Sequence, residues 1–241
     1  INTNGYAVVD LSAVGSHVLA VVTRPSPASC PPSSPVCKPF TLYSAAAGGD
    51  RWTAVPGGSG SGAVTAGGLQ LTPAGGYLMA GGRLYAGPLG GGAWRKVPAT
   101  GAGAPGCLAS PQAPDTRLIA AGRGTVYLAC GTANLDLYSS GNEGVSWRAL
   151  GTGPVPAGSA TSLAVSPAGH LVLATTSGLF YSDTGQKWIR ATAGSAANLA
   201  FRYIGMTTAT RGVAVPASPS ARAVFVTSDG GRTWRASQIS R

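Results

Sequence analysis

Five tryptophans recur along the chain, and each stands three residues after a glycine. They are Trp52, Trp94, Trp147, Trp188 and Trp234, at intervals of 42, 53, 41 and 46 residues. A repeat of about 40–50 residues is the length of one β-propeller blade, a four-stranded antiparallel sheet. The recurrence therefore predicts an all-β protein built as a five-bladed propeller.

Short runs of apolar residues bounded by Gly, Pro, Asn and Asp support four strands in each repeat. The clearest repeat places strands at 162–166, 170–175, 178–182 and 187–190, so that its tryptophan lies within the start of the fourth strand. With 241 residues, the protein is long enough to form one all-β domain. We therefore expect a single domain over 1–241, with blades near 5–56, 67–98, 107–151, 160–192 and 201–237.

The turn before each of the last three tryptophans carries residue types with a physical role. Five positions before the tryptophan stands Asn142, Asp183 or Asp229, whose side-chain oxygen can accept hydrogen bonds from backbone N–H groups of the turn. The glycine supplies a positive φ, and the tryptophan buries a large surface under its own hairpin. We assign a structural role to nine residues: Asn142, Gly144, Trp147, Asp183, Gly185, Trp188, Asp229, Gly231 and Trp234. The first two copies have Ala47 and Leu89 instead, so their turns must be held differently.

The fifth copy, which runs from Thr227 to Trp234, resembles in full the Asp box, or bacterial neuraminidase repeat, Ser/Thr-x-Asp-x-Gly-x-Thr-Trp. The third and fourth copies match it in part, and the first two keep only the glycine and the tryptophan. This repeat occurs in sialidases, in sorting receptors of the sortilin type and in photosystem assembly factors. The resemblance implies the propeller fold and, together with the residues below, a non-catalytic exported member.

A sialidase would need an arginine triad, a tyrosine nucleophile assisted by a glutamate, and an aspartate acid/base. Glu143 is the one glutamate of the sequence, and it lies inside a tryptophan turn. Outside those turns the acids are Asp10, Asp115 and Asp136, and the family's Arg-Ile-Pro signature near the first blade is absent. The sequence therefore predicts no catalytic residue and no enzyme activity, and a sialidase-like hydrolase is kept as an alternative.

Metal and cofactor sites lack their usual patterns. His17 and His170 both stand in the turn before the second strand of a blade, where we expect exposed histidines without further ligands nearby. No phosphate-binding loop and no Gly-x-Ser-x-Gly motif occurs. The sequence predicts no metal and no cofactor.

The cysteines are Cys30, Cys37, Cys107 and Cys130, without a C-x-x-C pair. Four cysteines allow three pairings. We favour the pairing of Cys30 with Cys37, across a proline-rich loop, and of Cys107 with Cys130. Four free thiols are the alternative. Disulfides would indicate an oxidising compartment.

The sequence begins at Ile1 and has no apolar run of about 18–20 residues, which is consistent with an exported protein whose signal or anchor has been removed.

The basic composition allows an anionic partner, but nucleic acid is not expected, because the protein is predicted to be exported and has few aromatic runs. The sequence contains seventeen basic and seven acidic residues, which gives a net charge of +10, and charged residues make up only 10% of it. A net charge of this size favours anionic partners without specifying a fold. The sequence favours a protein-docking scaffold or accessory subunit at the cell envelope. A lectin-like or anionic-polymer-binding propeller is the alternative, and the loop from Cys30 to Cys37 is a candidate contact.

Overall fold

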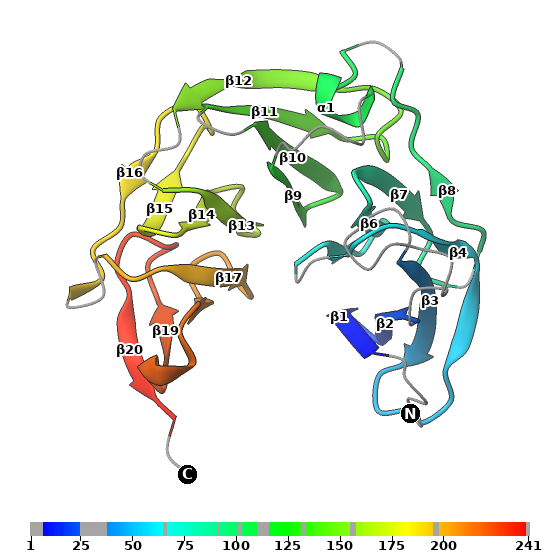
Figure 1. The fold of residues 1–241 in the computed structure, drawn as a ribbon, viewed down its shortest axis with the longest axis horizontal. Coiled ribbons are helices and arrows are strands. Elements are labelled where there is room, and N and C mark those ends of the chain that lie inside the picture. The colour runs from blue at the N-terminus through cyan, green and yellow to red at the C-terminus, as the bar shows by residue number, and fades with distance from the viewer. Residues whose placement is uncertain are drawn as a thin grey trace. The chain divides into compact units, whose positions relative to one another are not determined.

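The computed structural model of this protein describes residues 7–24, 38–64, 67–90, 92–100, 103–109, 116–131, 134–154, 158–194 and 198–239. It contains five four-stranded antiparallel sheets, in each of which the strands follow one another in sequence order (Figure 1). These sheets are the blades of a five-bladed β-propeller, which confirms the predicted fold class. No helix among the described residues is long and apolar enough to cross a membrane.

The strands of blade four begin and end within two residues of the positions predicted from the sequence. Blade one consists of β1 (Ala7–Val14), β2 (His17–Thr23), β3 (Pro39–Ala46) and β4 (Thr53–Ser61). Blade two consists of β5 (Leu69–Thr72), β6 (Gly75–Ala80), β7 (Arg83–Gly87) and β8 (Arg95–Lys96). Blade three consists of β9 (Thr116–Gly122), β10 (Thr125–Gly131), β11 (Asn134–Ser140) and β12 (Arg148–Pro154). Blade four consists of β13 (Ala160–Val165), β14 (Leu171–Thr175), β15 (Gly178–Ser182) and β16 (Ile189–Arg190). Blade five consists of β17 (Phe201–Met206), β18 (Gly212–Pro216), β19 (Ala223–Thr227) and β20 (Arg235–Gln238). Among the described residues, the short helices α1 (Gly106–Ala109) and η3 (Pro219–Ala221) lie in connections.

Contacts divide the protein into two compact units. The first unit comprises Ile1–Ala113, Gly124–Val126 and Ser140–Trp147. The second comprises Pro114–Arg123, Tyr127–Ser139 and Arg148–Arg241. Blades one and two thus belong to the first unit, together with the tryptophan turn of blade three, and blades four and five belong to the second. The expectation of a single domain over residues 1–241 stays a prediction.

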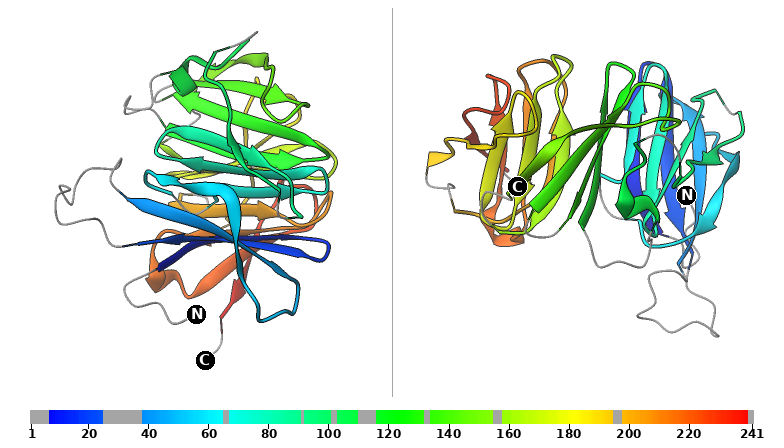
Figure 2. Two further views of the ribbon diagram at one scale, coloured as in Figure 1. Left: turned by 90° about the vertical axis from the view of Figure 1, so that its right-hand side faces the viewer. Right: turned by 90° about the horizontal axis from the view of Figure 1, so that it is seen from above.

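Alternation of side chains along the strands builds a core on both faces of a blade. All five residues of β14 are buried. Leu171 and Leu173 pack in one apolar cluster with Phe180, whereas Val172 and Ala174 pack in another with Phe201. Successive side chains of a strand point to opposite faces, so a strand covered on both faces reads as a continuous apolar run. The first unit has a comparable cluster, in which the Phe40 and Tyr85 rings meet edge to face at 5.6 Å. The strands of blade one, dark to light blue, twist across their sheet (Figure 2, left).

Three glycines of the tryptophan turns approach the preceding blade closely. Gly144, Gly185 and Gly231 have φ values of +78°, +82° and +93°. A Cβ atom at these positions would overlap Val97 of blade two, Leu137 of blade three and Val172 of blade four, respectively. Each glycine therefore satisfies two demands, a left-handed turn and a contact in which a side chain has no room.

Polar groups on the first strands also link neighbouring blades. In the first unit, Asp10 lies beside a bulge of β1, and its carboxylate accepts a hydrogen bond of 2.7 Å from the backbone N–H of Leu69 in blade two. In the second unit, the Ser162 hydroxyl beside the bulge of β13 accepts a hydrogen bond from the backbone N–H of Ile204 in blade five. A bulge redirects one side chain out of the regular ladder, which here brings it to the next blade. Burial raises the pKa of Asp10 above its ordinary 3.8, although hydrogen bonds from Leu69 and Leu11 act against this shift.

Gly185→Ala should lower stability by about 2–4 kcal/mol, because it adds overpacking against Leu137 to the cost of a positive φ. That loss corresponds to a melting temperature about 4–16 °C lower. Gly169→Ala is the matched control, since Gly169 has a φ of +92° and open space around its Cβ position. It should lose only about 1–2 kcal/mol. Equal losses for the two variants in thermal unfolding would show that crowding by Leu137 is unimportant.

Asp10→Ala should cost about 1–3 kcal/mol, because the N–H of the buried Leu69 loses its acceptor. Asp10→Asn keeps an acceptor and removes the titration. A raised pKa in the folded state means that protonation favours folding. The wild type should therefore gain stability relative to Asp10→Asn as pH falls from the raised pKa towards 3.8. Urea titrations of both proteins across this range measure the difference, and a difference that does not change with pH would contradict the assignment.

Candidate functional site

In every blade, the turn between the first two strands and the tryptophan turn between the last two lie at the same end of the sheet, because the strands are antiparallel and consecutive. We call this end of a blade its turn end. Loops held on a rigid sheet are where propellers and similar folds carry function. The turn-end residues within each unit are therefore the candidates for a functional site.

The turn of blade five is held by a network on Asp229. Its Oδ1 atom accepts hydrogen bonds from the backbone N–H groups of Arg232, at 3.0 Å, and Thr233, at 2.9 Å. Its carboxylate also accepts the hydroxyls of Thr227 and Thr233. Partial burial acts to raise the pKa of Asp229, but these hydrogen bonds outweigh it and hold the pKa below its ordinary 3.8.

The turn of blade three has the same arrangement without a charge. Asn142 Oδ1 accepts hydrogen bonds from the Ser146 backbone N–H at 3.0 Å and from the Ser140 hydroxyl at 2.9 Å. The Ser140 hydroxyl in turn accepts the N–H of Gly144. An amide thus performs the role of the carboxylate in this turn.

The turn of blade four differs from the sequence expectation for Asp183. Ser182, at the end of β15, accepts the N–H of Gly185, and the Thr184 hydroxyl accepts the N–H of Gln186. Asp183 instead meets two side chains outside its turn: its Oδ1 atom lies 2.7 Å from His170 Nδ1 and 3.3 Å from Arg232 Nη2. From the end of the third strand to the glycine, this turn is one residue shorter than the turns of blades three and five. Counting back five residues from Trp188 therefore points to Asp183, which does not hold the turn.

The tryptophans precede the fourth strands by one residue and do not belong to them. Trp94, Trp147 and Trp234 are buried, whereas Trp52 and Trp188 are half-buried. The indole N–H of Trp147 donates to the Gly144 carbonyl at 3.1 Å, and that of Trp234 donates to the Gly231 carbonyl at 2.9 Å. The indoles of Trp147 and Trp234 are thus each hydrogen-bonded to the glycine of their own turn.

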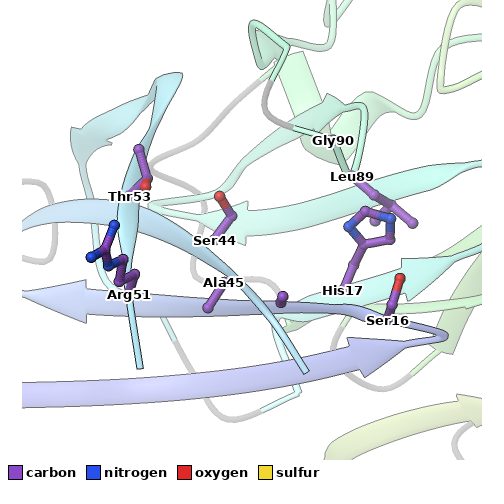
Figure 3. A pocket seen from close by; sticks show the side chains of 9 residues that line it. Ser16, His17, Ser44, Ala45, Arg51, Thr53, Leu89 and Gly90 are labelled. Atoms are coloured by element: carbon purple, nitrogen blue, oxygen red, sulfur yellow. The ribbon is translucent and has the colours of Figure 1, made fainter. Parts of the chain in front are cut away.

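The tryptophan turns of blades one and two, which keep only the glycine and the tryptophan of the repeat, border a pocket of about 440 Å³ (Figure 3). Blade one contributes Ser16 and His17 from its first turn, and Ser44, Ala45, Ala46, Arg51 and Thr53 from its tryptophan turn and the strands beside it. Leu89 and Gly90 of the blade two turn complete the lining. In Figure 3, His17 lies beside Leu89, whereas Arg51 lies nearer to Thr53. The lining contains two basic side chains, three hydroxyls and no acid.

Sequence reasoning placed His17 in an exposed turn, but it did not bring His17 and Arg51 together around a pocket. The sequence feature that could have indicated this pocket is the pair of tryptophan turns in blades one and two, where Ala47 and Leu89 replace the polar residue of the repeat. His170, expected as an exposed turn histidine, is half-buried and contacts Asp183.

The described carboxylates lie in separate settings. Asp136 accepts the Thr152 hydroxyl, Glu143 lies 3.5 Å from Arg95, and Asp10 accepts backbone N–H groups. Among residues whose positions the structure describes, no three His, Cys, Asp or Glu side chains are grouped so as to hold a metal ion. Asp115 lies outside the described residues.

Cys107 in α1 and Cys130 in β10 are each disulfide-bonded, which confirms oxidation of these two cysteines. Cys30, Cys37 and the loop between them lie outside the described residues, so the proposed contact through this loop stays a prediction.

Asp229→Ala should lower stability by about 1–2 kcal/mol, because two turn N–H groups lose their acceptor. Asp229→Asn should retain most of the stability, as Asn142 does in blade three. The depressed pKa means that the charge contributes stability above pH 3.8, and that this contribution is lost as pH falls through the folded-state value. Chemical unfolding from pH 7 to pH 2.5 should therefore show the wild-type advantage over Asp229→Asn vanish in acid. An advantage that persists in acid would contradict this account.

No protein-family model matches this sequence, and no curated protein matches it. Solved structures do share its fold. YCF48 bound to D1 peptide is 16% identical with a TM-score of 0.54, over 98% of this chain and 86% of that one. The nidogen/laminin complex gives 11% identity and a TM-score of 0.57, over 98% and 87%. The β-propeller domain of Myceliophteria thermophila Cps50 (Swd1) gives 9% identity and a TM-score of 0.58, over 97% and 74%. At these identities the likeness establishes a β-propeller fold.

Proposed function

We propose that this protein is a non-enzymatic, exported propeller of the Asp-box type that docks a protein partner through the turn end of its first unit. The observation that carries the proposal is the pairing, within one unit, of a basic pocket with an exposed apolar turn tip. The pocket is the one bordered by His17 and Arg51. The tip is Val145, whose side chain is 58% exposed.

Val145 is presented by a turn that is already ordered. Its N–H donates to the Asn142 carbonyl, and the Asn142 side chain holds Ser146 on the other side. An apolar side chain on a pre-organised turn loses little conformational freedom when a partner covers it. Such a position is suited to a protein contact.

Further observations support a binding role outside the cytoplasm. YCF48 is bound to D1 peptide and nidogen is in complex with laminin, so two proteins of similar fold take a peptide or a protein as ligand. The disulfide bonding of Cys107 and Cys130 is typical of an oxidising compartment. Asp10, Asp136, Glu143 and Asp229 each have a structural partner, which supports a binding role over acid–base chemistry.

Photo-crosslinking from position 145 tests the docking face. A benzoylphenylalanine residue in place of Val145 should capture one protein reproducibly on intact cells, and mass spectrometry identifies it. The same residue in place of Ser61 is the control, because Ser61 is exposed at the opposite end of blade one. The captured protein is then purified and titrated calorimetrically, where Val145→Asp should weaken binding at least tenfold and Ser61→Asp should leave it unchanged.

Three outcomes would overturn the proposal. They are equal capture from both positions, an affinity insensitive to Val145→Asp, and retention on anionic cell-wall polymer without any protein partner. The last would favour a polymer-binding propeller, which the net charge of +10 also suits.

A further inference from the structure

At the turn end, three boundaries between neighbouring blades are each bridged by a polar contact. In the first unit, Glu143 of the blade three turn lies 3.5 Å from Arg95 of blade two. In the second unit, Gln186 of the blade four turn donates to the Leu150 carbonyl of blade three at 2.6 Å. Arg232 of the blade five turn lies 3.3 Å from Asp183 of blade four. In all three, a polar side chain of the later turn reaches back to the earlier blade.

At the boundary between blades one and two, the 440 Å³ pocket lies at the place where the three other boundaries have a polar contact. Gly90 stands four residues before Trp94, as Glu143 stands four residues before Trp147. Gly90 has no side chain to reach across, and its neighbour Leu89 is apolar. The presence of a glycine at the position equivalent to Glu143 thus leaves an open space opposite the polar residues of blade one.

The basic side chains of this pocket are not neutralised by the described protein. The side chains of Arg51 and His17 form no ion pair or hydrogen bond with any described residue. Asp50 precedes Arg51 in the sequence, but it is exposed and does not line the pocket. A guanidinium on the wall of a concave site, with Ser16, Ser44 and Thr53 hydroxyls nearby, offers hydrogen-bond donors in the geometry that a carboxylate accepts.

We propose that this pocket binds a carboxylate of the docked partner, with Arg51 as its main ligand. The inference rests on the proposed docking function. The partner's carboxylate takes the place that Glu143 occupies one blade boundary later. A volume of about 440 Å³ accommodates one side chain or one terminal residue of a peptide. The carboxylate belongs either to an Asp or Glu side chain or to the terminal carboxyl group of a peptide.

NMR titration of the full-length ¹⁵N-labelled protein tests the pocket without a partner. Nα-acetyl-glutamic acid α-amide carries only a side-chain carboxylate, and Nα-acetyl-alanine carries only a terminal one. Nα-acetyl-glutamine α-amide is the neutral control. At least one carboxylate should shift the backbone amide signals of Ser16, Ser44 and Thr53 in a saturable way, with a Kd of about 1–10 mM, as expected for a ligand of this size. Whichever compound binds more tightly identifies the source.

Two pairs of variants make the test specific. Gly90→Glu supplies a carboxylate from the protein itself and should weaken binding at least tenfold, whereas Gly90→Gln should weaken it much less. Gly90 tolerates a side chain, because nothing lies within 4 Å of its Cβ position. Arg51→Gln should weaken binding about tenfold, and Arg235→Gln, which changes an exposed arginine of blade five, should have no effect.

Several results would overturn the carboxylate assignment. They are no saturable shift with either carboxylate, equal binding of the neutral amide, tighter binding of inorganic phosphate, and Arg51→Gln binding as well as wild type. If Val145→Asp still weakens the binding of a purified partner in that case, docking stands and only the pocket assignment fails. If carboxylates bind and no partner is captured, the pocket stands and docking fails.

Discussion

The close approach of a turn glycine to the blade before it is the contact on which the tryptophan turns depend. Gly144 meets Val97, Gly185 meets Leu137 and Gly231 meets Val172, and in each case a Cβ atom would overlap the facing side chain. Each glycine also has a positive φ, so one position determines both the shape of the turn and the packing of neighbouring blades. The tryptophan that follows donates its indole N–H to the same glycine's carbonyl at Gly144 and Gly231, which ties the fourth strand to this contact.

Polar residues in these turns have two separate tasks. Asp229 and Asn142 hold their own turns by accepting backbone N–H groups. Glu143, Gln186 and Arg232 reach instead to the preceding blade. Because the tasks are separate, a turn can lose its bridge while its blade persists. Blade two has done so: Leu89 and Gly90 leave Arg51 facing an open pocket, yet Trp94 stays buried and donates to the Pro88 carbonyl.

Sequence reasoning succeeded where the signal is periodic and failed where it depends on the length of a single turn. The tryptophan intervals predicted five blades, and the apolar runs placed the four strands of blade four within two residues. Asp183 was assigned to its turn because it stands five residues before Trp188. The end of β15 at Ser182 makes the loop shorter, so Thr184 stands where a capping side chain is needed. Periodicity measured from the tryptophan cannot locate the end of a strand, because that end is determined by pairing with β14.

By itself, the sequence determined the number of blades, their all-β class, the glycine and tryptophan positions of the turns and the excess of basic charge. These properties are local or periodic, since they follow from residue type and spacing. Only the tertiary structure decided which charges are paired, because pairing depends on distances between segments far apart in sequence. Arg232 meets Asp183 and Arg95 meets Glu143, whereas Arg51 has no described partner. Arg95 and Arg51 differ in whether the turn of the next blade carries a side chain that reaches the arginine, and this follows from the position of that turn in the folded protein.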